Sequence, residues 1–378
     1  MIQPDPDPLD LGPRPAIGVV KLGDLGDVLL VTPLLAELRT RYPAGRIEAV
    51  VRAGGASALV GNPHVDRVHV APMGGSIASA AFAWRLRRRR FDAMLLAHHL
   101  TLAGGARRHR LLVAASGAAI TVGLDNGRGA FLTHRVPDRG FGHLPEWRYW
   151  LRLGAVLGAA ADARPVFVLP AEATAAAGRL LAPLAGRRFV AIHPAVGRYG
   201  PGRAWPVGRF AALASALAAD PGVGIVTVGK SDALAAGAEI ARRHPTLDLT
   251  GATDTPTLAA VLRAASLTIG ADSGVVHLAA ALDRPTLALF GPSNHLAWSP
   301  VGAADHTLRL HRPGPPPTVG WVTTLRSDIP CSPCFYLGHS LGRPHGCATR
   351  SCLVELTVER VAEVARRMLS GGTGGAVD

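Results

Sequence analysis

The chain alternates between short apolar runs rich in β-branched residues and longer amphipathic runs, and this alternation limits the fold more than any other feature. Short apolar runs predict strands that are buried on both faces, and the longer runs predict helices. The expected strands span residues 16–22, 46–52, 67–70, 91–97, 120–124, 189–193, 224–229, 268–271 and 286–290. Because helices follow the strands, the pattern predicts α/β architecture with parallel sheets covered by helices on both faces.

An alanine- and proline-rich stretch, residues 161–170, separates two such alternating halves and is interpreted as a linker. At 378 residues, 48% of them hydrophobic, the chain can bury two cores. We therefore predict two Rossmann-like doubly wound domains facing a cleft. The expected divisions are residues 1–162, residues 163–356 with a cysteine cluster at 331–352, and residues 357–378 as a final helix and tail.

The formal net charge of +13 predicts attraction to phosphates, acidic glycans or an anionic membrane surface, although a solvated arginine-rich surface explains it equally well. Residues 1–15 have neither the basic start nor the apolar core of a signal peptide. The longest apolar run, residues 111–124, is too short to span a bilayer. These features predict a soluble cytoplasmic protein.

The first chemical motif is Gly23-Asp24-Leu25-Gly26-Asp27, between the strand 16–22 and a helix expected over residues 28–41. It lacks the G-x-G-x-x-G pattern of dinucleotide-binding folds. A carboxylate at the carboxyl end of a strand suits a base that takes a proton from a hydroxyl group, which points to Asp27. The alternative is that Asp27 caps the helix, since aspartate is a preferred capping residue.

A second group of polar residues follows strands of the second half. Backbone N–H groups at a helix start bind phosphate oxygens, and an arginine binds a diphosphate through charge-assisted hydrogen bonds. Singly, the histidines could be buried core residues and the arginine a solvated one. Together at one sheet edge they predict a nucleotide-diphosphate site. Its candidate residues are His193, Arg203, Asp272, Ser273, Gly274 and His277.

All four cysteines lie close together in the sequence, as Cys331, Cys334, Cys347 and Cys352. Two cysteine pairs around a short loop favour a structural metal site in a reducing compartment, with zinc as the first choice and iron as the second. Free or packed thiols are the alternative.

Three blocks of sequence carry a resemblance to the glycosyltransferase family 9 heptosyltransferases, which build lipopolysaccharide inner core from ADP-heptose. The first block runs from Lys21 to Pro33 and the second joins His193-Pro194 to Arg203-Ala204-Trp205-Pro206. The third block, residues 271–292, begins Ala-Asp-Ser-Gly-Val-Val-His and ends Leu-Phe-Gly-Pro. Together they extend over nearly the whole chain.

The resemblance implies a GT-B fold and an inverting, metal-independent transfer of a heptose from an ADP-sugar to a glycan or lipid-linked acceptor, with no catalytic cofactor. It makes Asp27 the general base, Arg203 the diphosphate-binding residue and Asp272 the acidic residue near the donor sugar. Ser273, Gly274 and His277 match the donor-binding loop. The N-terminal domain would hold the acceptor and the C-terminal domain the nucleotide sugar.

Two positions depart from the family pattern. The family often has serine where Gly23 stands, and Asp24 adds a second carboxylate. Asp24 could compete with Asp27 for the proton, or disfavour its charged form by repulsion.

Arginine runs at residues 85–90 and 107–110 are interpreted as an acceptor site, as a peripheral contact with the inner membrane, or as a solvated surface. Other acceptors, such as a protein or a natural product, and other nucleotide sugars remain alternatives. A nucleic-acid partner is not expected, because aromatic residues are few and the arginine runs lie far from the cysteines. An oxidoreductase is disfavoured because the dinucleotide fingerprint is missing.

Overall fold

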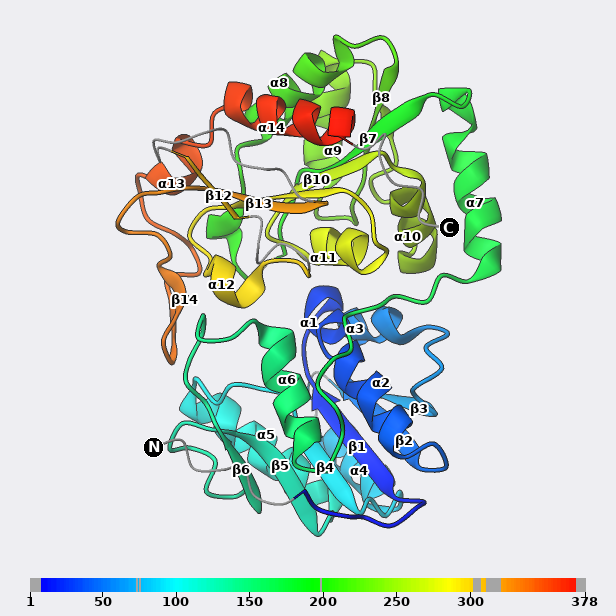
Figure 1. Ribbon diagram of the computed structural model, residues 1–378, viewed down its shortest axis with the longest axis vertical. Helices are drawn as coiled ribbons and strands as arrows, with labels where there is room; N and C mark the ends of the chain where they lie inside the picture. The colour runs from blue at the N-terminus through cyan, green and yellow to red at the C-terminus, as the bar shows by residue number, and fades with distance from the viewer. Residues whose placement is uncertain are drawn as a thin grey trace. The chain divides into compact units, whose positions relative to one another are not determined.

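The computed structural model describes residues 8–72, 74, 76–197, 199–301, 307–310 and 321–371 (Figure 1). The chain divides into two compact units. The N-terminal unit comprises Met1–Val168 together with Gly338–Ser340, and the C-terminal unit comprises Leu169–Leu337 together with Leu341–Asp378. Each unit has a parallel sheet of its own.

The N-terminal sheet has six strands in the order β3-β2-β1-β4-β5-β6, and every pair is parallel. This is the strand order of a doubly wound Rossmann fold, in which the winding direction reverses between β1 and β4. The strands are β1 Ala16–Lys21, β2 Arg46–Val51, β3 Arg67–Val70, β4 Ala93–Leu96, β5 Ile120–Asp125 and β6 His134–Pro137.

Helices cover both faces of this sheet (Figure 1). Helices α2 and α6 pack together on one face, and α4 and α5 pack together on the other. The helices of the unit are α1 Leu25–Leu29, α2 Thr32–Arg41, α3 Ala53–Ala56, α4 Ser76–Arg87, α5 Ala103–Ser116 and α6 Glu146–Ala155, with a 3₁₀ turn at Ser57–Leu59.

The single helix expected over residues 28–41 is in fact two helices. Helix α1 starts earlier, at Leu25 with Asp24 as its N-cap, and ends at Leu29. Pro33 lies in the first turn of α2, where proline is favoured because its missing N–H would have no helical partner. The break lets α1 point its first turn independently of α2, and Asp27 lies in that turn.

The C-terminal sheet repeats the same winding. Its seven strands run in the order β12-β13-β11-β10-β7-β8-β9, all parallel, with the reversal between β7 and β10. The strands are β7 Arg188–His193, β8 Val223–Thr227, β9 Leu247–Asp248, β10 Leu267–Ala271, β11 Thr286–Phe290, β12 Thr307–Leu310 and β13 Val322–Ser327. A separate hairpin pairs β14 Phe335–Leu337 with β15 Ser340–Gly342.

Helices again cover both faces of the C-terminal sheet. Helix α8 packs against α9 and α14, while α10 packs against α7 and α11 (Figure 1). The helices are α7 Ala171–Leu181, α8 Val207–Ala218, α9 Leu234–Arg243, α10 Thr255–Ala264, α11 Gly274–Ala281, α12 His295–Trp298, α13 Ser351–Val354 and α14 Val358–Gly371, with 3₁₀ turns at Ala182–Leu184 and Pro201–Arg203.

Trp205 anchors the loop that leads into α8. Its ring is fully buried and meets Phe210 edge-on, at 4.8 Å between ring centroids. Its Nε1–H donates to the carbonyl oxygen of Leu356 at 2.9 Å, so the polar atom of the indole is satisfied inside the core. The tryptophan of the Arg-Ala-Trp-Pro block therefore holds the loop in place, two residues after Arg203.

A buried carboxylate ties β2 to its surroundings. Glu48 is fully buried and forms ion pairs with Arg46, His69 and Arg89. Burial by itself raises the pKa of Glu48, but the hydrogen bonds from His69, Arg89 and Arg46 bring it far below its usual value. Arg89 belongs to the first arginine run, and its side chain, 30% exposed, balances a buried charge.

None of the helices in the described part of the chain is long and apolar enough to cross a membrane. Helix α14, among the longest, has 14 residues, against about 20 needed to span a bilayer. Helix α11 is a core helix, with each residue from Val275 to Ala281 buried, and all of these except His277 are apolar.

Candidate functional site

In the N-terminal unit several titratable side chains gather where the strand order reverses. Lys21 ends β1, and His98 and His99 follow β4, the neighbouring strand. The loop that carries Asp27 leaves β1 at the same edge. Ligands of doubly wound sheets bind at this edge, outside the carboxyl ends of the two strands that flank the reversal.

Asp27 has a fixed and partly exposed carboxylate. It lies in the first turn of α1, and its Oδ2 accepts a hydrogen bond from the backbone N–H of Asp24 at 3.1 Å. Its Oδ1 lies 3.9 Å from Nζ of Lys21, and 34% of its side chain is exposed. The alternative interpretation of Asp27 as the N-cap is wrong, because Asp24 is the N-cap and Asp27 lies at the third helical position, where it completes a capping box and still presents a carboxylate that can accept a proton.

Asp24 contributes its backbone to this arrangement. It is the exposed N-cap residue of α1, and its N–H fixes Asp27. Its own carboxylate lies over Gly54 of α3, where a Cβ would come within 2.5 Å of Asp24 Oδ1. The small residue at position 54 leaves room for the Asp24 side chain beside α3.

Gly23 makes room for the Asp27 side chain. A Cβ at position 23 would lie 2.3 Å from Cβ and 2.7 Å from Cγ of Asp27. Real Cβ atoms do not approach so closely, so any larger residue here must displace Asp27 or the turn. The glycine that departs from the family pattern is therefore matched to the position of the carboxylate in this chain.

His98 joins the ends of β1 and β4 and was not identified from the sequence. Its Nε2 accepts a hydrogen bond from the Leu22 N–H at 2.6 Å, and its ring stacks on His109 at 4.3 Å. Burial, with the nearby charges of His109 and Lys21, holds the pKa of His98 well below its usual value. The ring is therefore neutral, as an acceptor nitrogen requires. The sequence signal that could have identified His98 is the pair of adjacent histidines directly after an apolar strand.

The C-terminal unit has its polar cluster at the equivalent reversal. His193 is the last residue of β7, and Asp272 follows β10, which pairs with β7. Nδ1 of His193 lies 3.1 Å from Oγ of Ser273. Burial lowers the pKa of His193 to about 4, with the charge of Asp232 opposing this, so the imidazole is neutral at physiological pH.

Arg203 and Asp272 form an ion pair beside the start of α11. Nη1 of Arg203 lies 3.3 Å from Oδ2 of Asp272, and both side chains are largely buried. The Arg203 Nε–H donates to the carbonyl oxygen of Gly200 at 3.1 Å. The guanidinium also lies 5.9 Å from the centroid of the buried Phe335 ring, a contact that nothing in the local sequence indicated.

Gly274 and His277, the remaining predicted residues, lie on α11 itself. Gly274 is the first helical residue, directly after the N-cap Ser273, and His277 is buried one turn later. An arginine, a hydroxyl group and a helix N-terminus at one sheet edge form a site suited to an anion such as a phosphate.

The segment that carries the cysteines packs against the Arg203 loop. The Gly202 N–H donates to the carbonyl oxygen of Pro344 at 3.1 Å. A Cβ at position 202 would lie 2.4 Å from the backbone nitrogen of Gly346, so the two backbones can approach this closely only at a glycine. Residues 344–346 thus support the loop from which Arg203 projects.

The structure does not support the predicted metal site. All four thiols are free, but Cys331 is exposed, Cys334 and Cys347 are half-buried and Cys352 is buried. Cys352 belongs to the apolar core of the unit, and burial raises the pKa of its thiol to about 11. Among the described residues, no three side chains of the metal-binding types are arranged to hold an ion. The thiols are thus unevenly placed, with one of them serving as a core residue.

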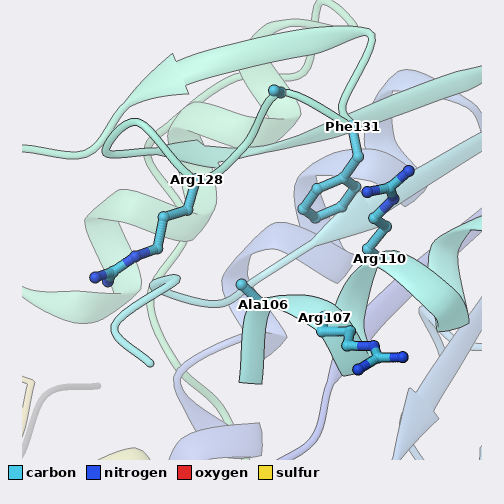
Figure 2. Close-up of a pocket in the computed structure, with 6 residues that line it drawn as sticks. Ala106, Arg107, Arg110, Arg128 and Phe131 are labelled. Atoms are coloured by element: carbon cyan, nitrogen blue, oxygen red, sulfur yellow. The ribbon is translucent and has the colours of Figure 1, made fainter. Parts of the chain in front are cut away.

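A basic pocket lies on the N-terminal unit (Figure 2). Its volume is about 410 Å³, and Figure 2 shows arginines from α5 and from the loop after β5 around it. The Arg128 guanidinium donates to the carbonyl oxygen of Leu100 at 2.9 Å and to that of Thr101. The pocket therefore adjoins the segment that follows β4. Its lining residues are Ala106, Arg107, Arg110, Arg128, Ala130 and Phe131.

Both units are doubly wound, and each has its predicted polar side chains at the reversal of strand order, where ligands of such sheets bind. The family model described as Glycosyltransferase family 9 (heptosyltransferase) matches residues 79–320. The chain therefore belongs to glycosyltransferase family 9, and it is an enzyme of the glycosyltransferase type with the GT-B fold. The family resemblance and the fold class expected from the sequence are both confirmed.

Individual relatives agree with this assignment. Lipopolysaccharide heptosyltransferase 3 of Escherichia coli is 27% identical over 292 residues, which cover 73% of this chain and 83% of the relative. A glycosyltransferase of family 9 from Veillonella parvula superposes with a TM-score of 0.73 at 20% identity, covering 96% of this chain and 98% of the other. The ADP-heptose lipopolysaccharide heptosyltransferase II of E. coli gives a TM-score of 0.69 at 21% identity, covering 94% and 99%.

The space at position 23 yields a direct prediction. Gly23→Ala should lower turnover by about a hundredfold or more if Asp27 is the base predicted from the sequence, because the new methyl group must displace its carboxylate and a small misplacement of a catalytic group is costly. Steady-state kinetics measure the loss, and circular dichroism checks the fold. Gly178→Ala on α7, where a Cβ meets nothing within 4 Å, is the matched control and should keep normal turnover. Normal turnover of Gly23→Ala would show that the carboxylate need not occupy its present place.

Proposed function

We propose that the enzyme transfers a heptose, or a closely related sugar, from an ADP-sugar to a glycan acceptor such as lipopolysaccharide core. The observation that carries this proposal is the cluster of Arg203, Asp272 and Ser273 at the start of α11, in a chain of the heptosyltransferase family. Relatives named for ADP-heptose and for lipopolysaccharide supply the choice of donor and acceptor.

In this proposal the C-terminal unit binds the nucleotide sugar and the N-terminal unit binds the acceptor. The C-terminal unit offers the anion site, with Arg203 beside the helix start. The N-terminal unit offers a carboxylate at its sheet edge and the basic pocket. A diphosphate matches the anion site of the C-terminal unit. A hydroxyl-bearing anionic glycan matches the carboxylate and the basic pocket of the N-terminal unit.

Asp27 acts as the general base. Its carboxylate takes the proton from an acceptor hydroxyl while that oxygen attacks the anomeric carbon of the donor sugar. The bond between the anomeric carbon and the diphosphate oxygen breaks, and its electron pair leaves with ADP. Attack from the face opposite the leaving group inverts the configuration, through a transition state with oxocarbenium character.

The charge that develops on the departing diphosphate is stabilised by Arg203 and by the backbone N–H groups at the start of α11. Asp272 holds the Arg203 guanidinium at this position, and the neutral ring of His193 holds the Ser273 hydroxyl. These groups provide the positive potential that the leaving group needs, so we propose that the transfer proceeds without a catalytic metal ion.

The basic pocket binds an anionic group of the acceptor in this proposal. Arg107, Arg110 and Arg128 are exposed around it, and together they favour a phosphate or carboxylate. Phe131 and two alanines supply an apolar wall against which a sugar ring can pack.

Measurements of turnover and of donor binding distinguish the proposed roles of Asp27 and Arg203. Asp27→Asn should reduce kcat by about a hundredfold to ten-thousandfold while ADP-heptose still binds, because only proton removal is lost. Arg203→Ala should weaken ADP binding and slow transfer together. Binding is measured by thermal shift or calorimetry and turnover by ADP release. Asp24→Asn, which keeps a good N-cap residue, should stay active. Loss of activity in Asp24→Asn with normal turnover in Asp27→Asn would contradict the assignment.

The basic pocket yields a prediction that distinguishes acceptor binding from donor binding. Arg110→Ala should raise KM for an anionic acceptor about tenfold or more, the value of one charge-assisted hydrogen bond, and leave KM for the donor unchanged. Initial rates with each substrate varied in turn give both constants. Arg179→Ala, an exposed arginine on α7 in the other unit, is the matched control for the loss of one positive charge. An equal rise in both constants for Arg110→Ala would remove the pocket from acceptor binding.

A further inference from the structure

A row of charged groups leads from Asp27 into the interior of the N-terminal unit. Next to Asp27 lies Lys21, with 3.9 Å between Nζ and Oδ1. Lys21 Nζ also lies 4.2 Å from the centroid of the Trp150 ring, and Glu146, the first residue of α6, lies one helical turn before Trp150 on the same face of the helix. Glu146 Oε1 lies 3.1 Å from His99 Nε2, and His99 Nδ1 lies 2.9 Å from Asp138 Oδ2. Acidic and basic groups alternate along the whole row.

All members of the row except Asp27 are buried. Lys21 and His99 have side chains exposed by 6% and 5%, and Glu146 and Asp138 by 0% and 1%. A charge removed from water is costly unless an opposite charge compensates it. Burial lowers the pKa of Lys21, and the carboxylates of Asp27 and Glu146 oppose that effect. Lys21 therefore has two compensating neighbours, one of which is the proposed base.

His99 supplies the positive charge on the inner side of Glu146. Burial tends to lower its pKa, but the charge of Glu146 and the hydrogen bond with Asp138 raise the pKa of His99 to about 9. Its ring is thus an imidazolium at neutral pH. Burial raises the pKa of Asp138, yet the hydrogen bond with His99 brings it below its usual value; His339 lies 3.7 Å from the same carboxylate.

Glu146 connects the two cations. It is fully buried, and its Oε2 has no hydrogen-bond partner among the described residues. Its negative charge is therefore balanced by cations and not by a full set of hydrogen bonds. Lys21 also lies over the ring of Trp150, at 4.2 Å from Nζ to the centroid, which fixes the ammonium group from another side.

We propose that Lys21 is a positioning residue for the base Asp27, and that Glu146, itself held by His99, keeps Lys21 in place while Asp27 is protonated. This inference rests on the proposed function in making Asp27 the base. One oxygen of Asp27 accepts a hydrogen bond from the Asp24 N–H, and the other lies 3.9 Å from the Lys21 ammonium group, within ion-pair distance. When Asp27 accepts the proton it loses its charge, and Glu146 remains as the partner of the buried ammonium group.

The proposal predicts opposite effects from the two neighbours of Asp27. Lys21 stabilises the ionised carboxylate, so its removal should move the acidic limb of the kcat profile to higher pH. Glu146 stabilises the state in which Asp27 is neutral and Lys21 is charged, so its removal should move the same limb to lower pH and lower the plateau. A merely structural role for either residue would produce neither displacement.

Other titratable groups near Lys21 do not account for the acidic limb of the kcat profile. His98 and His109 lie close enough for the Lys21 charge to affect both, and Arg52 acts on them as well. Burial lowers the pKa of His109 to about 4 and holds that of His98 well below its usual value. His109 therefore stays neutral from about pH 5 upward, His98 is neutral at physiological pH, and His99 stays charged up to about pH 9.

The test measures kcat and KM from pH 5 to 10 for the full-length chain with ADP-heptose and acceptor. For Lys21→Met we expect kcat at neutral pH to fall about tenfold or more, donor KM to change less than twofold, and activity to recover as the pH rises. Glu146→Gln should displace the acidic limb downward. The double variant should follow Lys21→Met, because Glu146 acts through Lys21. Should Lys21→Met fail to fold, Lys21→Gln carries the same measurement.

Glu48→Gln is the matched control, since Glu48 is an equally buried carboxylate with cationic partners, placed outside the candidate site. It should lower the unfolding temperature and leave the pH profile unmoved. If Lys21→Met and Glu146→Gln behave as this control does, the inference is overturned and the proposed function stands. If Asp27→Asn retains normal turnover, the proposed base is wrong, and the inference fails with it.

Discussion

The reversal of strand order in each parallel sheet is the constraint on which the rest of this structure depends. Neighbouring strands β1 and β4, and likewise β7 and β10, send their following helices to opposite faces. The carboxyl ends of these strands are therefore not covered by their own crossover connections. Lys21, His98 and His99 occupy this place in one unit, and His193 and Asp272 occupy it in the other.

Buried charge is the second organising feature, and it is handled differently in the two units. In the C-terminal unit, His193 is neutral and a single ion pair joins Arg203 to Asp272. In the N-terminal unit, a longer row alternates from Asp27 to Asp138. A single pair suits a site that must accept an anionic ligand. A compensated row would suit the proposed base, whose own charge changes during the reaction, because each buried cation keeps a partner throughout.

Much of the fold followed from local sequence pattern, and the exceptions have physical reasons. The central strands are continuous apolar runs and were predicted, whereas β9 has only two residues and β6 carries polar, partly exposed side chains. Helix α7 went unrecognised because its buried residues are alanines, which give little apolar periodicity. The break between α1 and α2 was not predicted because Pro33 is compatible both with one continuous helix and with two helices.

The candidate site was partly predictable for a similar reason. Motif positions such as Arg203, Asp272 and Ser273 stand next to strand or helix ends, and the structure brings them together. Partners from distant segments were not predictable: Glu146 meets His99 across 47 positions of sequence, and Phe335 reaches Arg203 from the cysteine-bearing segment. The cysteines are the opposite case, in which the sequence indicated a contact that the structure does not form. Their spacing predicted a metal site, but Cys352 packs into an apolar core.

The proposed reaction is a direct displacement in which Asp27 deprotonates the acceptor and ADP leaves from the opposite face. The most direct measurement is the configuration of the new glycosidic bond, read by NMR from the anomeric signals of donor and purified product. A direct displacement gives a product with the opposite anomeric configuration to the ADP-heptose supplied. A product with the same configuration as the donor would contradict a single displacement and require a different role for Asp27.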